Sequence, residues 1–305
     1  MSNYILDYKL IRPPLPGQTL RRLPYLPHLP RKLYTPPQLE SGRAKAMTVA
    51  AGFVCHNGVI LGADTEITFP GTGKTNESKL FPINREMGCY LTYTGVPDFA
   101  KELADRLRNK TKGEGADEIL RIMRQEYKEM REVQDKKPKE ERTWADFLIT
   151  VRRDVQEPFK TKIYDYEAEL YAARNENFFK VDKFLALGIG EELAAALFEP
   201  LYLKFSTREN AYLMVYAIKK IKQSIQGVGG RTEIIEIPNS DALPFADLGK
   251  LEIEQIEKDF DFLEEKIRPL LIAFPSEMTK QNFQLTLARF TKELKQHRKD
   301  KAKKP

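Results

Sequence analysis

The amino-acid sequence predicts an α+β protein in which two antiparallel sheets stack face to face and helices cover their outer sides. Strand-like and helix-like segments occur in groups along the chain, in the order strands, two helices, strands, two helices and a last strand. Grouped runs of this kind are typical of α+β layering rather than of alternating βαβ units. Two further helical patterns near the carboxyl end predict a helical hairpin added to the main domain.

The length and composition are those of a folded globular chain. Its 305 residues are 41% hydrophobic and 31% charged, which is sufficient for one large core or two modest ones. No segment approaches the ~18–20 apolar residues that a membrane-spanning helix needs. Cys55 and Cys89 fall in strand patterns and are expected in the core, and three histidines supply no clustered metal set. We therefore expect no membrane span, no metal and no cofactor, and the reduced-style cysteines fit a cytoplasmic protein.

The net charge of +6 is concentrated in the first 46 residues. This segment holds eight basic and only two acidic residues, so the rest of the chain is electrically balanced. A nucleic-acid-binding surface on the folded part is therefore not expected. The short basic end "KQHRKDKAKKP" is typical of a solvated terminus.

Residues 1–47 form a leader that differs in kind from the rest of the chain. Eight of the 19 prolines fall here, and proline removes backbone donors that helices and central strands need. We expect an extended, poorly packed segment without the apolar core of a secretory signal. Three explanations stay open: an organelle-targeting leader, a removable propeptide, or upstream sequence ahead of a true start at Met47. The remaining chain divides into a main domain at 48–240 and a helical hairpin with a basic tail at 241–305.

Two hairpins are predicted at the start of the main domain. The segments "TVAAGFVC" and "GVILGADT" flank His56-Asn57-Gly58, and Asn-Gly is a strong hairpin signal. A second pair, "KLFPI" and "CYLTYTG", is joined by the polar link "NREMG". The stretch "PGTGKTNESK" does not match a phosphate-binding loop, because that motif needs a glycine at position 68, where threonine stands.

Helical patterns follow the second hairpin. Pro97 opens a helix at a position where its missing N–H has no cost, and a second helix is predicted over about 116–133. Strands return in "WADFLITVRR", "KTKIYDYEAELYAA" and "KFLALGIG". Helices at about 191–204 and 207–226 and the strand "RTEIIEI" complete the domain.

The predicted carboxyl-terminal hairpin carries one apolar stripe on each of its two helices. The stripes make both helices amphipathic. The apolar positions are Leu251, Ile256, Phe260, Leu263, Ile267 and Leu270 in the first helix and Phe283, Leu287, Phe290 and Leu294 in the second.

These motifs together resemble a known family. The stretch "TVAAGFVCHNGVILGADTEIT", then "SKLFPI" and "YLTYTGVPDFAKELADRL", is similar to the amino-terminal half of proteasome β-type subunits and their bacterial relatives. These proteins are N-terminal nucleophile (Ntn) hydrolases, and the later order of elements matches them to about residue 237. The resemblance implies a four-layer αββα sandwich of two antiparallel sheets, with the helical extension beyond it.

The resemblance assigns roles to four residues. Thr48 would be the nucleophile, and its own α-amino group, with a reference pKa of ~7.7–8.0, would be the base. Lys79 would point toward Thr48, and Asp64 would keep the lysine charged and oriented. Gly95 corresponds to the oxyanion-hole glycine, whose N–H would meet the negative charge that develops on a substrate carbonyl.

This chemistry requires Thr48 to be the first residue, because an internal threonine has an amide nitrogen without usable basicity. Removal of an initiator Met47 would expose Thr48 with no other processing. If residues 1–47 are translated, cleavage between Met47 and Thr48 is needed, and the glycine that usually precedes the threonine is absent.

Four positions depart from the family pattern. Glu66 stands where an arginine commonly follows the aspartate, and Ile189 replaces a glycine-flanked serine. Ile225 and Val228 occupy the aspartate and serine positions of the family's D-x-x-S-G-G motif. This half of the site therefore lacks its usual polar side chains.

We interpret the sequence as a threonine endopeptidase-like hydrolase that acts on a peptide or protein substrate. The resemblance implies a homo-oligomeric ring, and the helices after 245 are a candidate contact for a neighbouring subunit or a regulator. They could equally form a lid on their own domain. The alternative function is a catalytically inactive proteasome-like subunit retained for assembly.

Overall fold

The computed structural model describes most of the chain after the leader. The described residues are 48–69, 73–155, 166–202, 205–240, 245–273 and 280–302. Side chains are described over the same ranges except at 69, 269–273, 280–286, 298 and 300–302. The predicted leader and the first part of the predicted strand "KTKIYDYEAELYAA" lie outside the described residues.

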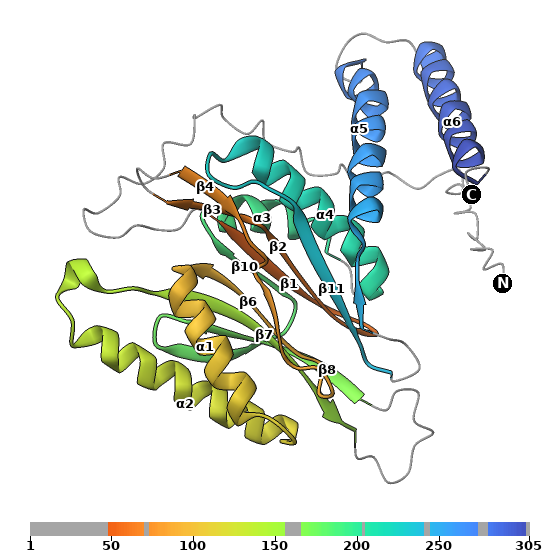
Figure 1. Ribbon diagram of the computed structural model, residues 1–305. Coiled ribbons are helices and arrows are strands. Elements are labelled where there is room, and N and C mark those ends of the chain that lie inside the picture. Colours follow the sequence, from red (N-terminus) through yellow and green to blue (C-terminus); the bar gives the residue numbers. More distant parts are fainter. Residues whose placement is uncertain are drawn as a thin grey trace, which may run out of the picture. The chain divides into compact units, whose positions relative to one another are not determined.

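One five-stranded antiparallel sheet has the first predicted hairpin at its centre (Figure 1). β1 (Val49–Cys55) pairs with β2 (Gly58–Asp64), and the strand order is β10-β1-β2-β11-β12. The other strands are β10 (Phe184–Gly188), β11 (Thr232–Pro238) and β12 (Ala246–Asp247). The turn needs its glycine, because a Cβ on Gly58 would lie 2.3 Å from the carbonyl oxygen of Ile237.

The second five-stranded sheet is antiparallel throughout and has the order β5-β6-β7-β8-β9. Its strands are β5 (Leu80–Asn84), β6 (Cys89–Gly95), β7 (Ala145–Asp154), β8 (Tyr166–Arg174) and β9 (Asn177–Val181).

Four short strands were missed by the sequence patterns. β3 (Glu66–Phe69) and β4 (Gly73–Asn76) form a separate hairpin, which lies between β2 and β5 in the sequence. β9 and β12 lie at sheet edges. All four residues of β4 are exposed. Such strands lack the alternation of buried and exposed residues that would reveal them.

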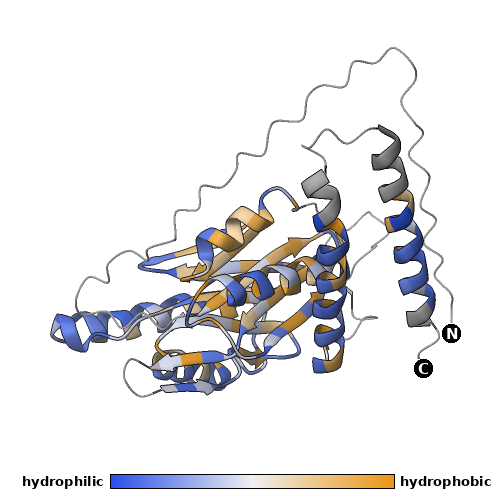
Figure 2. Ribbon diagram, turned by 90° about the horizontal axis from the view of Figure 1, so that it is seen from above, coloured by the Kyte–Doolittle hydropathy of each residue, from blue (hydrophilic) through white to orange (hydrophobic). Residues whose placement is uncertain are grey.

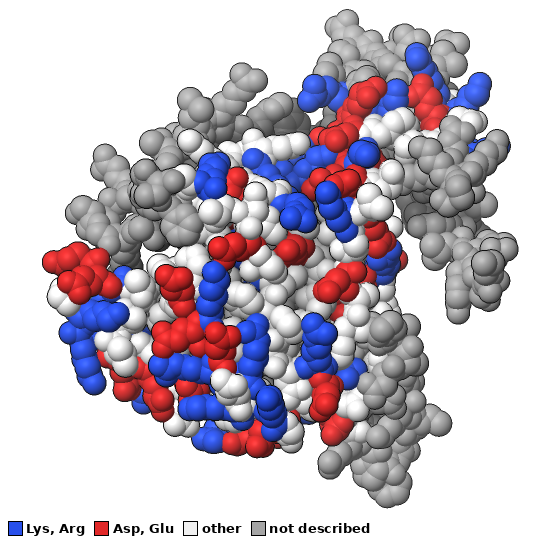
Figure 3. Space-filling model, viewed as in Figure 1, with Lys and Arg blue, Asp and Glu red and all other residues white. Residues whose placement is uncertain are grey.

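Each sheet has two helices of the main domain on its outer side (Figure 1). α1 (Pro97–Lys110) and α2 (Ala116–Asp135) cover the second sheet, and α3 (Glu191–Phe198) and α4 (Thr207–Ser224) cover the first. α3 is shorter than predicted, because Pro200 cannot donate the next helical hydrogen bond. On the face seen in Figure 3, basic and acidic side chains are interspersed.

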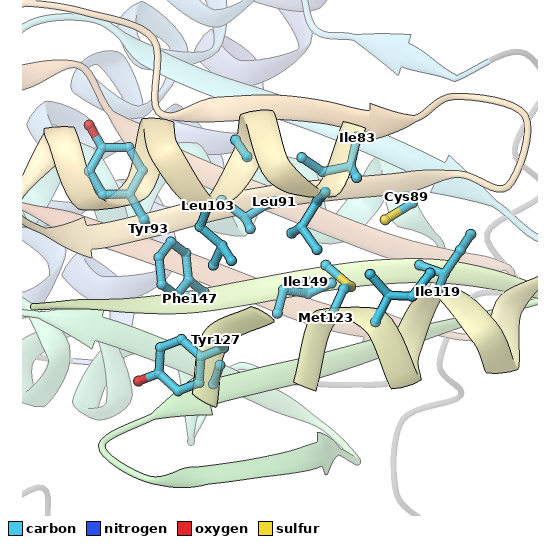
Figure 4. Packing of buried hydrophobic residues seen from close by; sticks show 14 of the residues in the cluster. Ile83, Cys89, Leu91, Tyr93, Leu103, Ile119, Met123, Tyr127, Phe147 and Ile149 are labelled. Carbon is cyan, nitrogen blue, oxygen red and sulfur yellow. The ribbon is translucent and has the colours of Figure 1, made fainter. Parts of the chain in front are cut away.

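Three hydrophobic clusters hold the sheets and helices together. In the first, Tyr127 of α2 packs edge-on against Phe147 of β7, and Met123 of α2 lies next to Ile149 (Figure 4). The second lies between α3, α4 and the first sheet, and the third joins the facing sides of the two sheets through residues such as Leu61 and Leu170. Because β2 is buried on both faces, its sequence is a nearly continuous apolar run. Figure 2 shows the same division, with apolar residues gathered on the strands.

Two long helices follow the main domain. They are α5 (Lys250–Ala273) and α6 (Lys280–Ala302). Ile253 and Ile256 of α5 are buried in the cluster beneath α4, and Phe260 packs against it. Leu251, which belongs to the apolar pattern of the same helix, is 81% exposed. Leu251 lies two residues before Ile253, which places it on the opposite side of the helix.

The helical pair makes its described contacts through polar and aromatic groups. Lys266 of α5 lies 3.1 Å from a carboxylate oxygen of Glu293 in α6, and Phe262 stacks on His297. Ile267 and Leu287, two further positions of the apolar patterns, are also exposed. Leu270 and Phe283 lie outside the described side chains.

Candidate functional site

Three of the four predicted site residues meet at one end of the first sheet. Thr48 immediately precedes β1, Asp64 ends β2, and Lys79 lies just before β5. The Lys79 Nζ donates hydrogen bonds to Asp64 Oδ1, at 2.8 Å, and to Thr48 Oγ1. The Thr48 hydroxyl donates in turn to Asp64 Oδ1 at 2.6 Å. Each of these residues is at most 1% exposed.

The hairpin register explains the meeting of Thr48 and Asp64. Ala50 lies opposite Ala63, so the start of β1 and the end of β2 lie side by side. Backbone donors then hold the carboxylate from two sides: Val49 N–H donates to Oδ1 at 3.0 Å, and Gly229 N–H donates to Oδ2 at 3.1 Å. Hydrogen bonds of this kind to a charged acceptor fix its orientation.

Lys79 reaches the same point from the other sheet. Besides Thr48 and Asp64, its ammonium donates to the carbonyl oxygen of Glu66 at 2.6 Å, so all three of its N–H donors have acceptors. Burial lowers the pKa of Lys79 from its usual value, although the negative charges of Asp64, Glu66 and Glu233 act in the opposite direction. The site therefore contains a buried ammonium group whose position is fixed by three hydrogen bonds.

Gly95, the fourth predicted residue, ends β6 beside β7. Its φ is +113°, and a Cβ would come within 2.4 Å of the Trp144 carbonyl oxygen, so only glycine fits. The next N–H, of Val96, donates to Trp144 at 2.8 Å. Because antiparallel ladders alternate their hydrogen bonds, the Gly95 N–H points away from β7. β5 begins opposite Thr92, so this N–H is directed past the end of that strand.

The end of β6 lies close to Thr48 through the last residue of β10. Gly188 has a φ of +93°, and a Cβ there would lie 2.1 Å from the Thr48 carbonyl oxygen and 3.0 Å from Thr94 Cγ2. Ile189 N–H donates to the same Thr48 oxygen at 3.1 Å. The backbone of Thr48 is thus held between two strands, next to the strand that ends in Gly95.

The positions that depart from the family pattern serve packing and backbone contacts. Val228 is buried in the cluster beneath α4, and Ile189 and Ile225 pack against that cluster. The side chain of Glu66 pairs with Lys74 at 2.6 Å, while its carbonyl oxygen receives Lys79. On this side of Asp64 the described donor is therefore the backbone of Gly229 rather than a polar side chain.

Sequence reasoning missed a second lysine near the site. Lys222 of α4 donates to Thr232 of β11 at 2.6 Å, and Thr232 lies opposite Asp64 in the first sheet. No local signal pointed to this lysine, because its nearness to Asp64 depends on the pairing of β11 with β2.

The described part of the chain contains neither a metal-binding cluster of side chains nor a helix that could span a membrane. Among residues 48–302 outside the gaps given above, no group of three or more His, Cys, Asp or Glu side chains could hold a metal ion. None of the described helices is long and apolar enough to cross a membrane. Cys55 and Cys89 are both unpaired and buried, so the prediction that they are core residues is confirmed.

The fold can be compared with known structures. Two packed antiparallel sheets with flanking helices are consistent with the proteasome-like fold that the sequence resemblance implied. Among solved structures, the chain is similar to a mutant of Anbu from Hyphomicrobium sp. strain MC1, a bacterial proteasome-like Ntn hydrolase. The TM-score is 0.55 at 16% sequence identity, over 72% of this chain and 97% of that chain. This likeness shows the fold. No family model and no curated protein matches the sequence.

Proposed function

We propose that this protein is a threonine-type hydrolase of the Ntn class, with a four-layer αββα sandwich, in which Thr48 attacks a peptide or amide carbonyl. The observation that carries the proposal is the contact of Thr48 Oγ1 with the buried ammonium of Lys79, with Asp64 bound to both. A cation beside a hydroxyl and an amine lowers the proton affinity of both groups.

The proposed reaction starts when the residues before Thr48 have been removed. The freed α-amino group, with a reference pKa of ~7.7–8.0, then takes the hydroxyl proton as Oγ1 attacks the carbonyl carbon. The amine returns this proton to the leaving nitrogen, and an ester joins the acyl group to Thr48. Water then attacks the ester and gives a proton to the amine. The C–Oγ1 bond breaks, the amine passes that proton to Oγ1, and the acid is released with the threonine regenerated.

Two groups would stabilise charge during this reaction. The Gly95 N–H, directed past the end of β5, would donate to the carbonyl oxygen as it becomes negative, a contribution typically worth ~10²–10³ in rate. Lys79 would stabilise the developing charge on Oγ1, and Asp64 would hold the lysine in place. No metal or cofactor enters any step.

We also propose that the chain works as a homo-oligomer, as the resemblance to ring-forming proteins implies. Large apolar side chains are exposed at the end of α3 and over the start of α4, at Leu201, Phe205 and Tyr212. Burial of such residues against a second copy would remove apolar surface from water. Light scattering of the purified chain tests this part of the proposal, and a monomeric mass at working concentration would contradict it.

The second candidate function is an inactive assembly subunit of the same fold. It is favoured by the apolar packing of Ile189, Ile225 and Val228 at positions where the family has polar side chains. A chain that keeps Met47 would also fit this function, because Thr48 would then have no free amine.

The deciding experiment is mass spectrometry of the amino terminus together with labelling by a peptide epoxyketone, which adds to terminal threonines. The hydrolase proposal expects a terminus at Thr48 and one adduct on that residue, lost in Thr48→Ala. Thr75→Ala, which alters an exposed threonine of β4, is the control and should label normally. A purified chain that reads through Met47 and takes no label would instead support the assembly subunit.

A further inference from the structure

A second partly buried lysine borders the proposed site. The Lys222 Nζ, near the end of α4, donates to Thr232 Oγ1 at 2.6 Å, and its side chain is 16% exposed. Thr232 begins β11 directly opposite Asp64. Thr65 N–H donates to the carbonyl oxygen of Arg231, so the Asp64–Thr232 pair is the non-hydrogen-bonded kind, with Cα atoms only about 4.5 Å apart. Lys222 is thus attached to the residue that flanks the site's carboxylate.

Glu257 of α5 binds both members of this contact. Its Oε1 accepts from the Thr232 hydroxyl at 3.3 Å and lies 3.9 Å from the Lys222 Nζ. The Glu257 carbonyl oxygen also accepts from Lys219 Nζ at 2.6 Å. Polar contacts therefore lead from Thr232, the cross-strand neighbour of Asp64, to α4 and α5.

The charges along this route act on one another. Burial lowers the pKa of Lys222, the carboxylates of Glu257 and Asp64 act in the opposite direction, and the like charge of Lys79 lowers it further. Lys79 in turn faces Asp64, Glu66 and Glu233. Two ammonium groups thus share the influence of one carboxylate, Asp64, so removal of either changes the proton affinity of the other.

A cavity of about 790 Å³ opens beside the same groups. Lys222, Thr232 and Glu257 contribute to its wall, together with residues of β5, β12 and the start of α5. Water in this cavity can exchange protons with Lys222, so the lysine can titrate without opening of the fold.

We propose that Lys222 is a positioning residue of the Thr48 site and that Glu257, by holding it, makes α5 part of that site. The proposal rests on the proposed function. Lys222 supplies positive charge beside Thr232, the cross-strand neighbour of Asp64. With that charge in place, the amines of Thr48 and Lys79 hold their protons less tightly.

The test compares Lys222→Met with Lys220→Met in the full chain. Lys220 is the matched control, because it also joins α4 to a glutamate of α5, Glu264, but has no contact with Thr232. The first readout is the NMR titration of the Lys79 side chain. Loss of a neighbouring like charge should raise the pKa of Lys79 in Lys222→Met and leave it unchanged in Lys220→Met. An unchanged Lys79 titration in Lys222→Met overturns the proposal.

The second readout is the pH profile of Thr48 labelling. In Lys222→Met the whole profile should move to higher pH by about one unit, with a rate at pH 7 that is up to ~10-fold lower. If Thr48 takes no label but the pKa of Lys79 still rises in Lys222→Met, the proposed function is contradicted and the effect of Lys222 on Lys79 is supported. If Lys222→Met does not fold, Thr232→Val replaces it, with Thr232→Ser as the variant that keeps the hydroxyl and should restore the profile.

The role of α5 is tested by a double-mutant cycle. Glu257→Gln should change the profile in the unsubstituted chain and change it much less in the Lys222→Met background, because Glu257 acts through the lysine. If Glu257→Gln changes the profile equally in both backgrounds, Glu257 does not act through Lys222, and the proposed role of α5 in the site is contradicted.

Discussion

Lys79 is a charged side chain at 1% exposure, and its surroundings explain how the fold tolerates it. Removal of an ammonium from water is costly, and a single ion pair seldom repays that cost. Here three oxygens accept its hydrogen bonds, one each from Thr48, Asp64 and Glu66. A side chain held at this cost contributes little net stability, and its burial is better explained by the chemistry proposed for Thr48.

We expect Lys79→Met to destabilise the chain by about 3–5 kcal/mol, because it leaves the buried carboxylate of Asp64 without its cation. The double variant Asp64→Asn with Lys79→Met should recover part of this loss. Urea unfolding measures both. Lys74→Met, five residues earlier and exposed, is the control and should change the free energy of unfolding by less than about 1 kcal/mol. Equal stabilities for the two lysine variants would contradict the buried pair.

The two cysteines should be inert in the native protein. Burial raises the pKa of Cys55 and of Cys89 to about 12, although a hydrogen bond from Asn210 to Cys55 acts slightly in the other direction. Thiolate is the reactive form, so iodoacetamide at neutral pH should leave the folded chain unmodified and add twice after unfolding. Intact-mass measurement counts the adducts, and rapid modification of the folded chain would show that one of the thiols is accessible.

At the scale of elements, cross-strand charges join three strands of the second sheet on one side. Glu169 of β8 accepts from Lys180 of β9 at 2.7 Å and lies 3.3 Å from Arg153 of β7. Burial raises the pKa of Glu169, but hydrogen bonds from Lys180 and Tyr171 outweigh it, so that the pKa is lowered overall. Edge strand β9 is therefore attached by charge as well as by its ladder.

This network should make stability depend on pH in a defined direction. A carboxyl whose pKa is lower in the folded state contributes stability above its unfolded pKa of about 4.3, and this stability is lost as the pH falls through the folded value. Glu169→Gln should therefore destabilise the chain by about 1–2 kcal/mol at about pH 6 and hardly at all near pH 2. Thermal unfolding of Glu169→Gln and of the exposed-site control Glu167→Gln measures the difference. A loss that is the same at both pH values would point to packing instead.

The elements with strong periodicity were predicted from the sequence, and those without it were not. The Asn57-Gly58 turn and the helix from Pro97 to Lys110 are set by local backbone preferences, so they are readable in the chain. The hairpin of β3 and β4 has too little apolar alternation to be recognised. The apolar pattern of α5 did not show that Leu251 is exposed, because the face of α5 that packs depends on its neighbour α4 and not on the helix alone.

At the scale of the whole molecule, α5 and α6 differ in how far they belong to the packed body. Ile253 and Ile256 of α5 are buried in the cluster beneath α4, whereas most described side chains of α6 are partly or fully exposed. Lys219, Lys220 and Lys222 of α4 add ionic contacts to α5. α5 therefore contributes to the core of the domain.

Two truncations should separate these contributions. A chain that ends at Gly249 loses two fully buried isoleucines, each worth about 1.5–3 kcal/mol, and should be destabilised by at least about 3 kcal/mol. A chain that ends at Ala273 keeps α5 and should lose much less. Urea unfolding of both compares them with the full chain. Equal losses would show that α6, and not α5, carries the stability of this region.

The sequence by itself determined the first hairpin, and with it the nearness of Thr48 and Asp64, because sixteen residues and one Asn-Gly turn lock that register locally. It also determined the grouping of strands and helices. Only the tertiary structure decided what surrounds that pair. Lys79 arrives from a different sheet, the Gly229 N–H from the loop after α4, and Lys222 and Glu257 from two helices. Contacts between segments so far apart in the chain depend on how the sheets and helices pack, and no local pattern of residues records that packing.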